Sequence, residues 1–253
     1  MRINPDFRKV AILAANEAGK ALKKNFRRPT KVNFKKDSSL ITGVDLEADE
    51  IIKKIIKKNF PSHGIVSEEG GGKSGKDFTW IVDPLDGTTN YVLGLSFFSV
   101  SLALLKGREL VLSIVFNPIS KEFYLAEKNR GAYLNGKRIM VNKTGNLSKS
   151  TLLFNKGKDL KEGLKFLIKL ASRVRTTRFF GSANLEVCQV ALGKVEGYLA
   201  CKPAYHDHIA GVLIAKESGA IATDFGRKKY GPCSKNLIVA NPKIHSQLLK
   251  LIK

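Results

Sequence analysis

The chain has 253 residues, of which 43% are hydrophobic and 26% are charged. This composition is typical of a globular protein with room for one large domain or two smaller ones. No apolar run approaches the ~20 residues that a transmembrane helix needs, and the N-terminal segment lacks the apolar stretch of a secretory signal, so we predict a cytoplasmic protein with no membrane partner.

Lysine and arginine total 44 residues against 22 aspartates and glutamates, which gives a formal net charge of +22. Such an excess favours phosphorylated partners, and it leaves a non-catalytic nucleic-acid-binding protein as an alternative. The lysines are dispersed, however, and the densest basic run, residues 24–36, contains a proline and no nucleic-acid-binding motif. We therefore predict no specific nucleic-acid partner. The three cysteines have no C-x-x-C spacing, so neither a zinc site nor a disulfide framework is expected.

The first 60 residues predict two helices. Apolar residues at near-helical spacing indicate a helix over residues 5–25. In the segment "TGVDLEADEIIKKIIKKNF" (42–60), a polar turn precedes a helix with isoleucines on one face and lysines on the other. Asp45 stands where the N-cap of this helix is expected.

Residues 65–141 predict mainly β-structure. Ile65–Val66 and residues 79–82 indicate short buried strands, and the glycine- and lysine-rich segment 70–76 between them indicates a loop. The long apolar runs 97–105 and 110–116 indicate a hairpin. The meander continues beyond them, with Asn135-Gly136 as a turn.

From residue 151 onward, strands and helices alternate. The pattern predicts a strand at 151–154, a helix at 159–173, a strand, turn, helix and strand over 175–200, a helix from near Asp207 to Gly219, a strand at 236–241 and a closing helix. The fold class is therefore α/β (α+β), with layered sheets and helices. We expect an N-terminal α+β subdomain over residues 1–150 and a C-terminal α/β subdomain over residues 151–253, sharing one cleft.

Acidic residues stand at the ends of several apolar runs. They are Glu68, Asp83, Asp86 and Asp207, with Asp45 at a helix start. A buried carboxylate costs several kcal/mol unless a partner offsets that cost. Taken singly, Asp45 and Asp207 suit helix caps, but the pair Asp83 and Asp86 around a proline suits a hard divalent cation with oxygen ligands.

The residues after Asp86 suit a phosphate. Gly87-Thr88-Thr89 follows a strand and can open a helix, whose free N–H groups would bind phosphate oxygens. A threonine hydroxyl could orient a water molecule. Composition and spacing alone therefore indicate a possible metal-dependent enzyme acting on phosphates.

Five segments, in order along nearly the whole chain, resemble the inositol monophosphatase family of magnesium-dependent, lithium-sensitive sugar phosphatases. "WIVDPLDGTTNY" (80–91) is similar to the family's first signature, and "YHDHIAG" (205–211) is similar to its second. The other three are "LITGVD" (40–45), "SEEG" (67–70) and "GSANLEVCQVALGKVEGY" (181–198). The resemblance implies a layered α-β-α-β-α sandwich, usually a homodimer.

The resemblance also implies a magnesium site with two to three ions. Glu68, Asp83 and the backbone carbonyl of Leu85 would bind the first ion, and Asp83, Asp86 and Asp207 would bind the second. A third, weaker ion would lie near Glu68. His206 and His208 flank Asp207, and we expect them beside the ligands or at the surface rather than as ligands themselves.

Catalytic roles follow from the same resemblance. Thr88 would activate the attacking water, Asp45 would polarise the threonine hydroxyl, and Glu68 would assist through the metal. The backbone N–H groups of Gly87 and Thr88 would hold the phosphate. Asp86 and Ala183 would contact the substrate.

The expected substrate is a small phosphorylated polyol or sugar, myo-inositol monophosphate first. Fructose 1,6-bisphosphate is the main alternative, because compact microbial members that resemble this chain include enzymes acting on it. NADP(H) and 3′-phosphoadenosine 5′-phosphate are weaker alternatives. Ala200 stands where the family often has a substrate-contacting glutamate, which leaves the substrate open.

Overall fold

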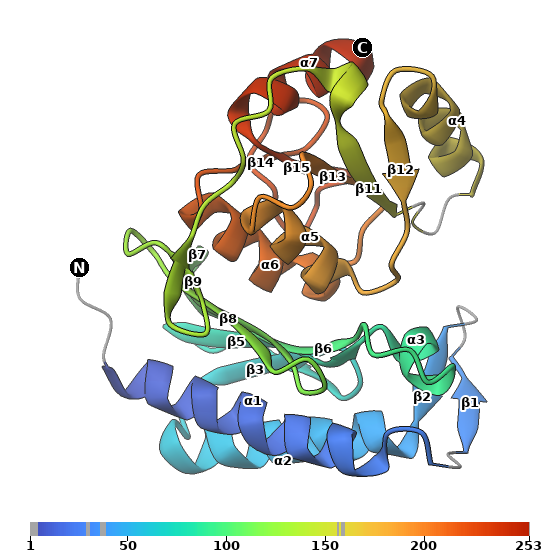
Figure 1. Cartoon of the computed structure of the whole chain (residues 1–253). Coiled ribbons are helices and arrows are strands. Elements are labelled where there is room, and N and C mark those ends of the chain that lie inside the picture. Colours follow the sequence, from blue (N-terminus) through green and yellow to red (C-terminus); the bar gives the residue numbers. More distant parts are fainter. Residues whose placement is uncertain (1–4, 29–30, 36–38, 156, 158–159, 253) are drawn as a thin grey trace.

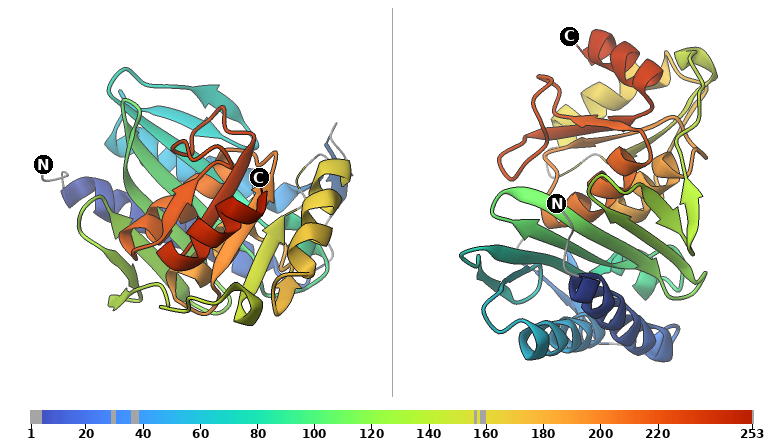
Figure 2. Two further views of the ribbon diagram at one scale, coloured as in Figure 1. Left: turned by 90° about the horizontal axis from the view of Figure 1, so that it is seen from above. Right: turned by 90° about the vertical axis from the view of Figure 1, so that its left-hand side faces the viewer.

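The computed structural model describes residues 5–28, 31–35, 39–155, 157 and 160–252. Helices and sheets alternate in five layers (Figure 1). Helices α1 (Pro5–Asn25) and α2 (Gly43–Asn59) form the first layer, α5 (Ala183–Ala191) and α6 (His206–Glu217) the middle one, and α4 (Leu160–Ala171) and α7 (Pro242–Ile252) the last. Figure 2 shows the same layers from two further sides. The predicted α-β-α-β-α sandwich is therefore confirmed.

An eight-stranded sheet separates the first two helix layers. Its strand order is β10-β9-β8-β7-β6-β5-β3-β4, and every neighbouring pair is antiparallel except β3 and β5. The strands are β3 (Gly64–Ser67), β4 (Gly71–Lys73), β5 (Phe78–Asp86), β6 (Ser99–Lys106), β7 (Glu109–Asn117), β8 (Glu122–Glu127), β9 (Ala132–Leu134) and β10 (Lys137–Ile139).

A five-stranded sheet separates the middle and last helix layers. Its order is β12-β11-β13-β15-β14, and β11 runs parallel to both of its neighbours. The strands are β11 (Thr151–Asn155), β12 (Thr176–Arg178), β13 (Gly197–Cys201), β14 (Ile221–Thr223) and β15 (Asn236–Ala240). Four short elements complete the fold: the antiparallel strands β1 (Val32–Phe34) and β2 (Leu40–Thr42), helix α3 (Thr88–Val92) and the 3₁₀ turn Leu147–Lys149.

Alternation along the strands explains the layering. In β5, Trp80 and Val82 belong to the apolar cluster that α1 and α2 cover, whereas Ile81 between them belongs to the cluster built around α5 and α6. Successive side chains of a strand point to opposite faces, so a strand that is apolar at every position requires helices on both sides. A third cluster fills the space between the five-stranded sheet and α7. In the described part of the chain, no helix is long and apolar enough to cross a membrane.

Three local predictions were wrong. The segment 70–76 is not only a loop, because Gly71–Lys73 pairs with β3 as an edge strand. Strand β5 does not end at residue 82; it runs through both acids to Asp86. The N-cap of α2 is Thr42 rather than Asp45, and Asp45 completes a capping box three residues later by accepting the backbone N–H of Thr42 at 2.9 Å.

Candidate active site

The parallel pair β3 and β5 brings the first two acids together. Ser67 lies opposite Val82 in the register, and the backbone N–H of Glu68 donates to the carbonyl of Val82 at 3.0 Å. Glu68 and Asp83 therefore lie side by side at the same end of this strand pair. Asp83 is only 1% exposed, and its Oδ1 accepts the backbone N–H of Leu85 at 3.1 Å.

A β-bulge separates Asp83 from Asp86. The pairing of β5 with β6 shifts register between these two residues, and a bulge re-aims the side chains that follow it. The Asp86 carboxylate consequently faces the start of α5. It accepts hydrogen bonds from Ser182 Oγ at 2.7 Å and from the backbone N–H groups of Ala183 at 2.9 Å and Asn184 at 2.8 Å.

The capping box of α2 places Asp45 beside Thr88. One carboxylate oxygen of Asp45 accepts hydrogen bonds from Thr42, while the other lies 3.1 Å from Thr88 Oγ1. The same hydroxyl lies 3.1 Å from the carbonyl of Leu85. The Thr88 hydroxyl therefore lies within hydrogen-bond distance of both Asp45 and Leu85. Asp45 and Thr88 are 43 residues apart in the sequence, and all three residues were assigned to one site from the sequence.

Gly87 makes the turn from β5 into α3. Its φ is +96°, a left-handed conformation that glycine adopts without strain. A Cβ at this position would lie 3.1 Å from the Gly181 carbonyl and 3.1 Å from Ser182 Cβ. Glycine thus lets the α3 turn approach the start of α5 closely.

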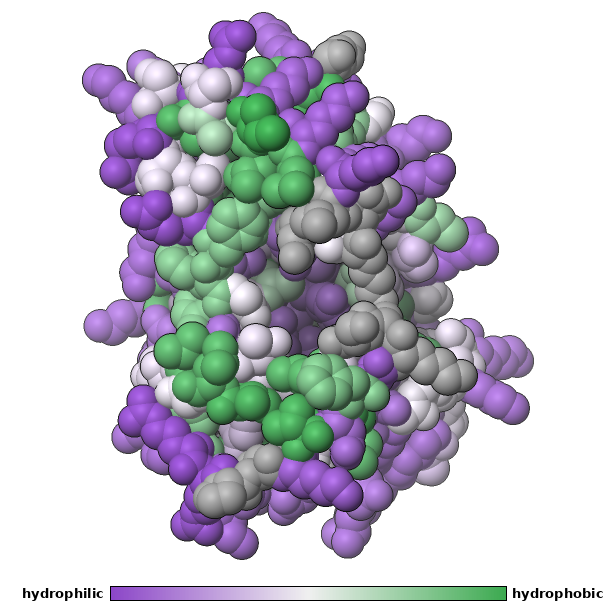
Figure 3. Space-filling model, turned by 90° about the vertical axis from the view of Figure 1, so that its right-hand side faces the viewer, coloured by the Kyte–Doolittle hydropathy of each residue, from purple (hydrophilic) through white to green (hydrophobic). Residues whose placement is uncertain are grey.

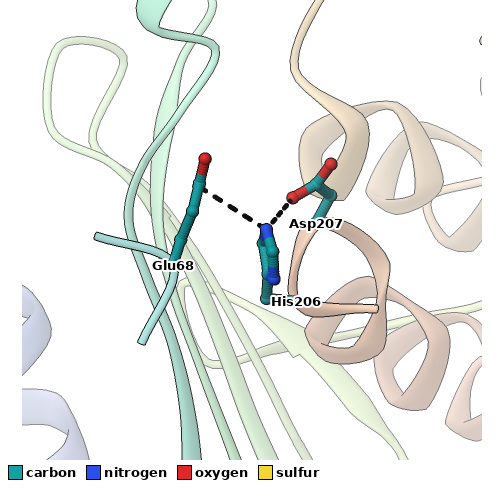
Figure 4. A group of neighbouring side chains, drawn as sticks. All are labelled: Glu68, His206 and Asp207. Atoms are coloured by element: carbon teal, nitrogen blue, oxygen red, sulfur yellow. Dashed lines mark ion pairs between the residues drawn. The ribbon is translucent and has the colours of Figure 1, made fainter. Parts of the chain in front are cut away.

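The second helix layer contributes Asp207. Figure 4 shows Glu68, at the end of β3, facing the first turn of α6, which carries His206 and Asp207. His206 Nε2 lies 2.9 Å from Asp207 Oδ1 and 3.9 Å from Glu68 Oε2. One ligand atom from each of these three residues lies within 4.8 Å of the others, close enough to share a metal ion.

Lys35 reaches the same group from the segment after β1. Its ammonium nitrogen lies 2.7 Å from a carboxylate oxygen of Glu68 and 2.7 Å from one of Glu69. These contacts partly neutralise the acidic cluster. Burial raises the pKa of Glu69 to about 7, even though the hydrogen bond from Lys35 lowers it.

Two carboxylates of this group, Asp83 and Asp86, resist ionisation. Burial raises the pKa of Asp83 well above its ordinary value, and the charges of Glu68, Asp86 and Asp207 raise it further. Burial also raises the pKa of Asp86 to about 7, although its hydrogen bonds to the start of α5 favour the ionised form. A bound cation would remove this repulsion, and the carboxylate and carbonyl oxygens present are the donors that hard divalent cations prefer.

These pKa shifts predict how stability depends on pH. Because the folded chain retains protons on these acids that the unfolded chain loses near pH 4, folding binds protons between about pH 4 and pH 7. The free energy of unfolding of chelator-treated protein should therefore fall as pH rises through this range. We expect Tm to be lower at pH 8 than at pH 5, and added Mg²⁺ to reverse most of this loss. A Tm that falls equally in Asp83→Asn would show that the cluster is not the cause.

Lys35 should weaken cation binding. Its positive charge lies on Glu68, where an incoming metal ion must compete with it or lie beside it. We expect Lys35→Met to tighten Mg²⁺ binding by roughly three- to tenfold in isothermal titration, since one charge at this range is worth about 1 kcal/mol in a partly solvated site. The exposed Lys31→Met is the matched control and should leave affinity unchanged. Weaker binding in Lys35→Met would mean that Lys35 orders the cluster instead.

Sequence reasoning placed most of these residues but not all of their contacts. The structure brings together Glu68 with Asp207 and Asp45 with Thr88, and it links Asp86 to Ala183. It adds Lys35, which the sequence did not place, and it shows that His206, expected beside the ligands or at the surface, lies between Glu68 and Asp207. His208 is buried, where its ring contacts the Tyr198 hydroxyl at 2.6 Å. The metal-binding and substrate-binding roles stay predictions.

Comparison with known proteins identifies the family. A model of the inositol monophosphatase family matches residues 4–253. The chain is 36% identical to "Nus factor SuhB" of Vibrio cholerae, covering 96% of this chain and 94% of that protein. It is 34% identical to a "fructose-1,6-bisphosphatase/inositol-1-monophosphatase" of Aquifex aeolicus, again covering 96% and 94%.

Solved structures agree. An IMPase from Thermotoga maritima superposes with a TM-score of 0.91 at 34% identity, covering 98% of this chain and 96% of that one. The suhB protein from Bartonella henselae superposes with a TM-score of 0.93 at 30% identity, covering 98% of both chains. The chain therefore belongs to the inositol monophosphatase family, and it is a phosphoric monoester hydrolase.

Proposed function

We propose that this protein is a magnesium-dependent phosphomonoesterase that hydrolyses myo-inositol monophosphate to inositol and phosphate. The observation that supports it most is the meeting of Glu68 and Asp83 from one sheet with Asp207 from the helix layer above it. Four mutually repelling carboxylates, two of them buried, need a cation to ionise together. Glu68, Asp83, Asp86, Asp207 and the carbonyl of Leu85 would hold Mg²⁺, which would supply charge stabilisation for the phosphate and the leaving oxygen.

The protein's own residues would position the water and the phosphate. Asp45 accepts the hydrogen bond of the Thr88 hydroxyl, which fixes the direction of the remaining lone pairs on Oγ1. Those lone pairs would accept an O–H of the attacking water and align its oxygen with phosphorus. The backbone N–H groups of Gly87 and Thr88, at the start of α3, would bind phosphate oxygens.

A second substrate candidate comes from the relatives of this chain. Relatives in the comparison are named both as fructose-1,6-bisphosphatase/inositol-1-monophosphatase and as Nus factor SuhB. Fructose 1,6-bisphosphate is therefore the second candidate. Phosphate release from inositol 1-phosphate, fructose 1,6-bisphosphate and NADP, each with Mg²⁺ and with chelator, separates the candidates. We expect turnover of inositol 1-phosphate only with Mg²⁺; faster turnover of another ester would replace the substrate but keep the chemistry.

We also infer a homodimer, with an apolar surface next to the site as its interface. Figure 3 shows apolar residues gathered on one face of the molecule. Leu93 is 67% exposed and Leu95 is 52% exposed; the Phe97 and Phe180 rings beside them lie 5.2 Å apart. Sedimentation analysis should give a dimer for the wild type and a monomer for Leu93→Lys/Leu95→Lys. A wild-type monomer at micromolar concentration would contradict the inference.

A further inference from the structure

A cavity lies beside α6, along the part of that helix that follows its first turn. Its volume is about 250 Å³. Its walls come from α6, the turn between β6 and β7, the end of β8, and β14 with the segment that follows it. None of the active-site carboxylates lines it. The cavity is therefore separate from the active site. Its lining includes Tyr205, which directly precedes His206 in the sequence.

The walls of this cavity carry more positive than negative charge. Arg108, Lys128, Lys216 and Lys229 line it, against Glu109 and Glu217. An ion pair joins Glu109 to Lys128. In the part of the chain that the structure describes, no ion pair joins a carboxylate to any of the other three cations.

The second acid, Glu217, is engaged by the backbone. Its carboxylate accepts N–H groups from Asn129 at 2.8 Å, Arg130 at 3.1 Å and Gly131 at 2.9 Å. These bonds turn the carboxylate toward the β8–β9 turn. Lys216 next to it has the pKa of its ammonium lowered, first by partial burial and then by the charge of Lys229, although much of its side chain is exposed. Two like charges held close together would be relieved by an anion between them.

The floor of the cavity is apolar. Ile209, Val212 and Leu213 present successive turns of α6 to it, and the rings of Tyr205 and Tyr230, 5.9 Å apart, also line it. Pockets that combine an apolar floor with a few convergent polar groups are typical of small-molecule sites. A volume near 250 Å³ is at the lower limit for such sites, which suits a molecule with a single ring.

We propose that this cavity is a second binding site, for a small organic anion that carries one planar ring and a phosphate, phosphonate or carboxylate group. The ring would lie on the α6 floor and the anionic group would lie between Lys216, Lys229 and Arg108. This site does not depend on the catalytic proposal, because it shares none of the predicted catalytic residues.

Phenylphosphonate is a suitable probe, because it combines a ring with an anionic group and its C–P bond resists hydrolysis. Its binding is measured by isothermal titration to the full chain in chelator, where the acidic active site repels anions. We expect a dissociation constant on the order of 1 mM, in line with the affinity of other ten-atom ligands. Inorganic phosphate, which lacks the ring, should bind at least tenfold more weakly.

Variants locate the binding. Lys216→Met/Lys229→Met should weaken phenylphosphonate binding about tenfold or more, since the loss of one hydrogen bond to a charged group weakens binding by roughly tenfold. Arg108→Gln should weaken it independently. The matched control Lys54→Met/Lys58→Met removes two exposed lysines of α2 and should leave binding unchanged. Failure of phenylphosphonate to bind the wild type at 10 mM (about ten times the expected constant), or equal binding by both double variants, would overturn the proposal.

Discussion

Replacing Asp83 by asparagine is expected to abolish phosphatase activity and, at the same time, to raise the Tm of the metal-free protein at pH 8. Asp83 is only 1% exposed, and the charges of three other carboxylates raise its pKa. Asparagine has nearly the same shape but no charge, and an amide nitrogen replaces one carboxylate oxygen, so it removes the repulsion and weakens the proposed metal binding together. We expect kcat to fall by at least ~10³-fold, as for other residues whose loss removes transition-state charge stabilisation.

The opposite signs of the two effects make this variant informative. A merely destabilising substitution lowers activity and Tm together, whereas a metal ligand taken from a crowded acidic site lowers the first and raises the second. Asp77→Asn, at an exposed position just before β5, is the matched control and should change neither quantity. Activity in Asp83→Asn within tenfold of the wild type would remove Asp83 from the metal site.

Replacing Thr88 by valine is expected to lower kcat by roughly 10²- to 10³-fold, while Thr88→Ser retains most activity. Valine has the same shape without the hydroxyl, so it deletes the hydrogen bond to Asp45 and the acceptor for the attacking water. Because Thr88 is not expected to bind metal through its side chain, Mg²⁺ affinity should stay unchanged in both variants.

Thr89→Val is the matched control for this pair. Thr89 is the next residue of α3, and its side chain is exposed. Steady-state kinetics of the three variants, with KM and kcat determined separately, should show the effect in kcat of Thr88→Val only. An equal loss in Thr88→Ser would indicate that the fit of the methyl group, rather than the hydroxyl, governs the rate.

Much of the fold could be predicted because its signals are local. The amphipathic period of α1 and the long apolar runs of β6 and β7 each lie within one stretch of sequence. The bulge in β5 could not be predicted in the same way, because it arises from pairing with β6. Edge strand β4 could not be predicted either, because Gly71–Lys73 has no strand-like side-chain pattern and forms a strand only by pairing with β3.

In the candidate site, too, the residues marked by local motifs could be predicted, whereas those defined by long-range contacts could not. Glu68, Asp83 and Asp207 could be proposed because each ends or opens an element at a recognisable motif. Lys35 could not, because its contact with Glu68 spans 33 residues and it lies in a run of basic residues with no distinguishing feature. His206 looked like a neighbour of a ligand, and only the approach of α6 to β3 shows that it lies between Glu68 and Asp207.

The proposed catalysis requires that acids from the large sheet and from α6 form one divalent-cation site. Crystals of the protein grown with MnCl₂, a Mg²⁺ substitute with a measurable anomalous signal, test it directly. We expect anomalous peaks among Glu68, Asp83, Asp86 and Asp207, and we expect these peaks to be lost in Asp83→Asn. Well-ordered density for these four side chains with no anomalous peak between them would contradict it.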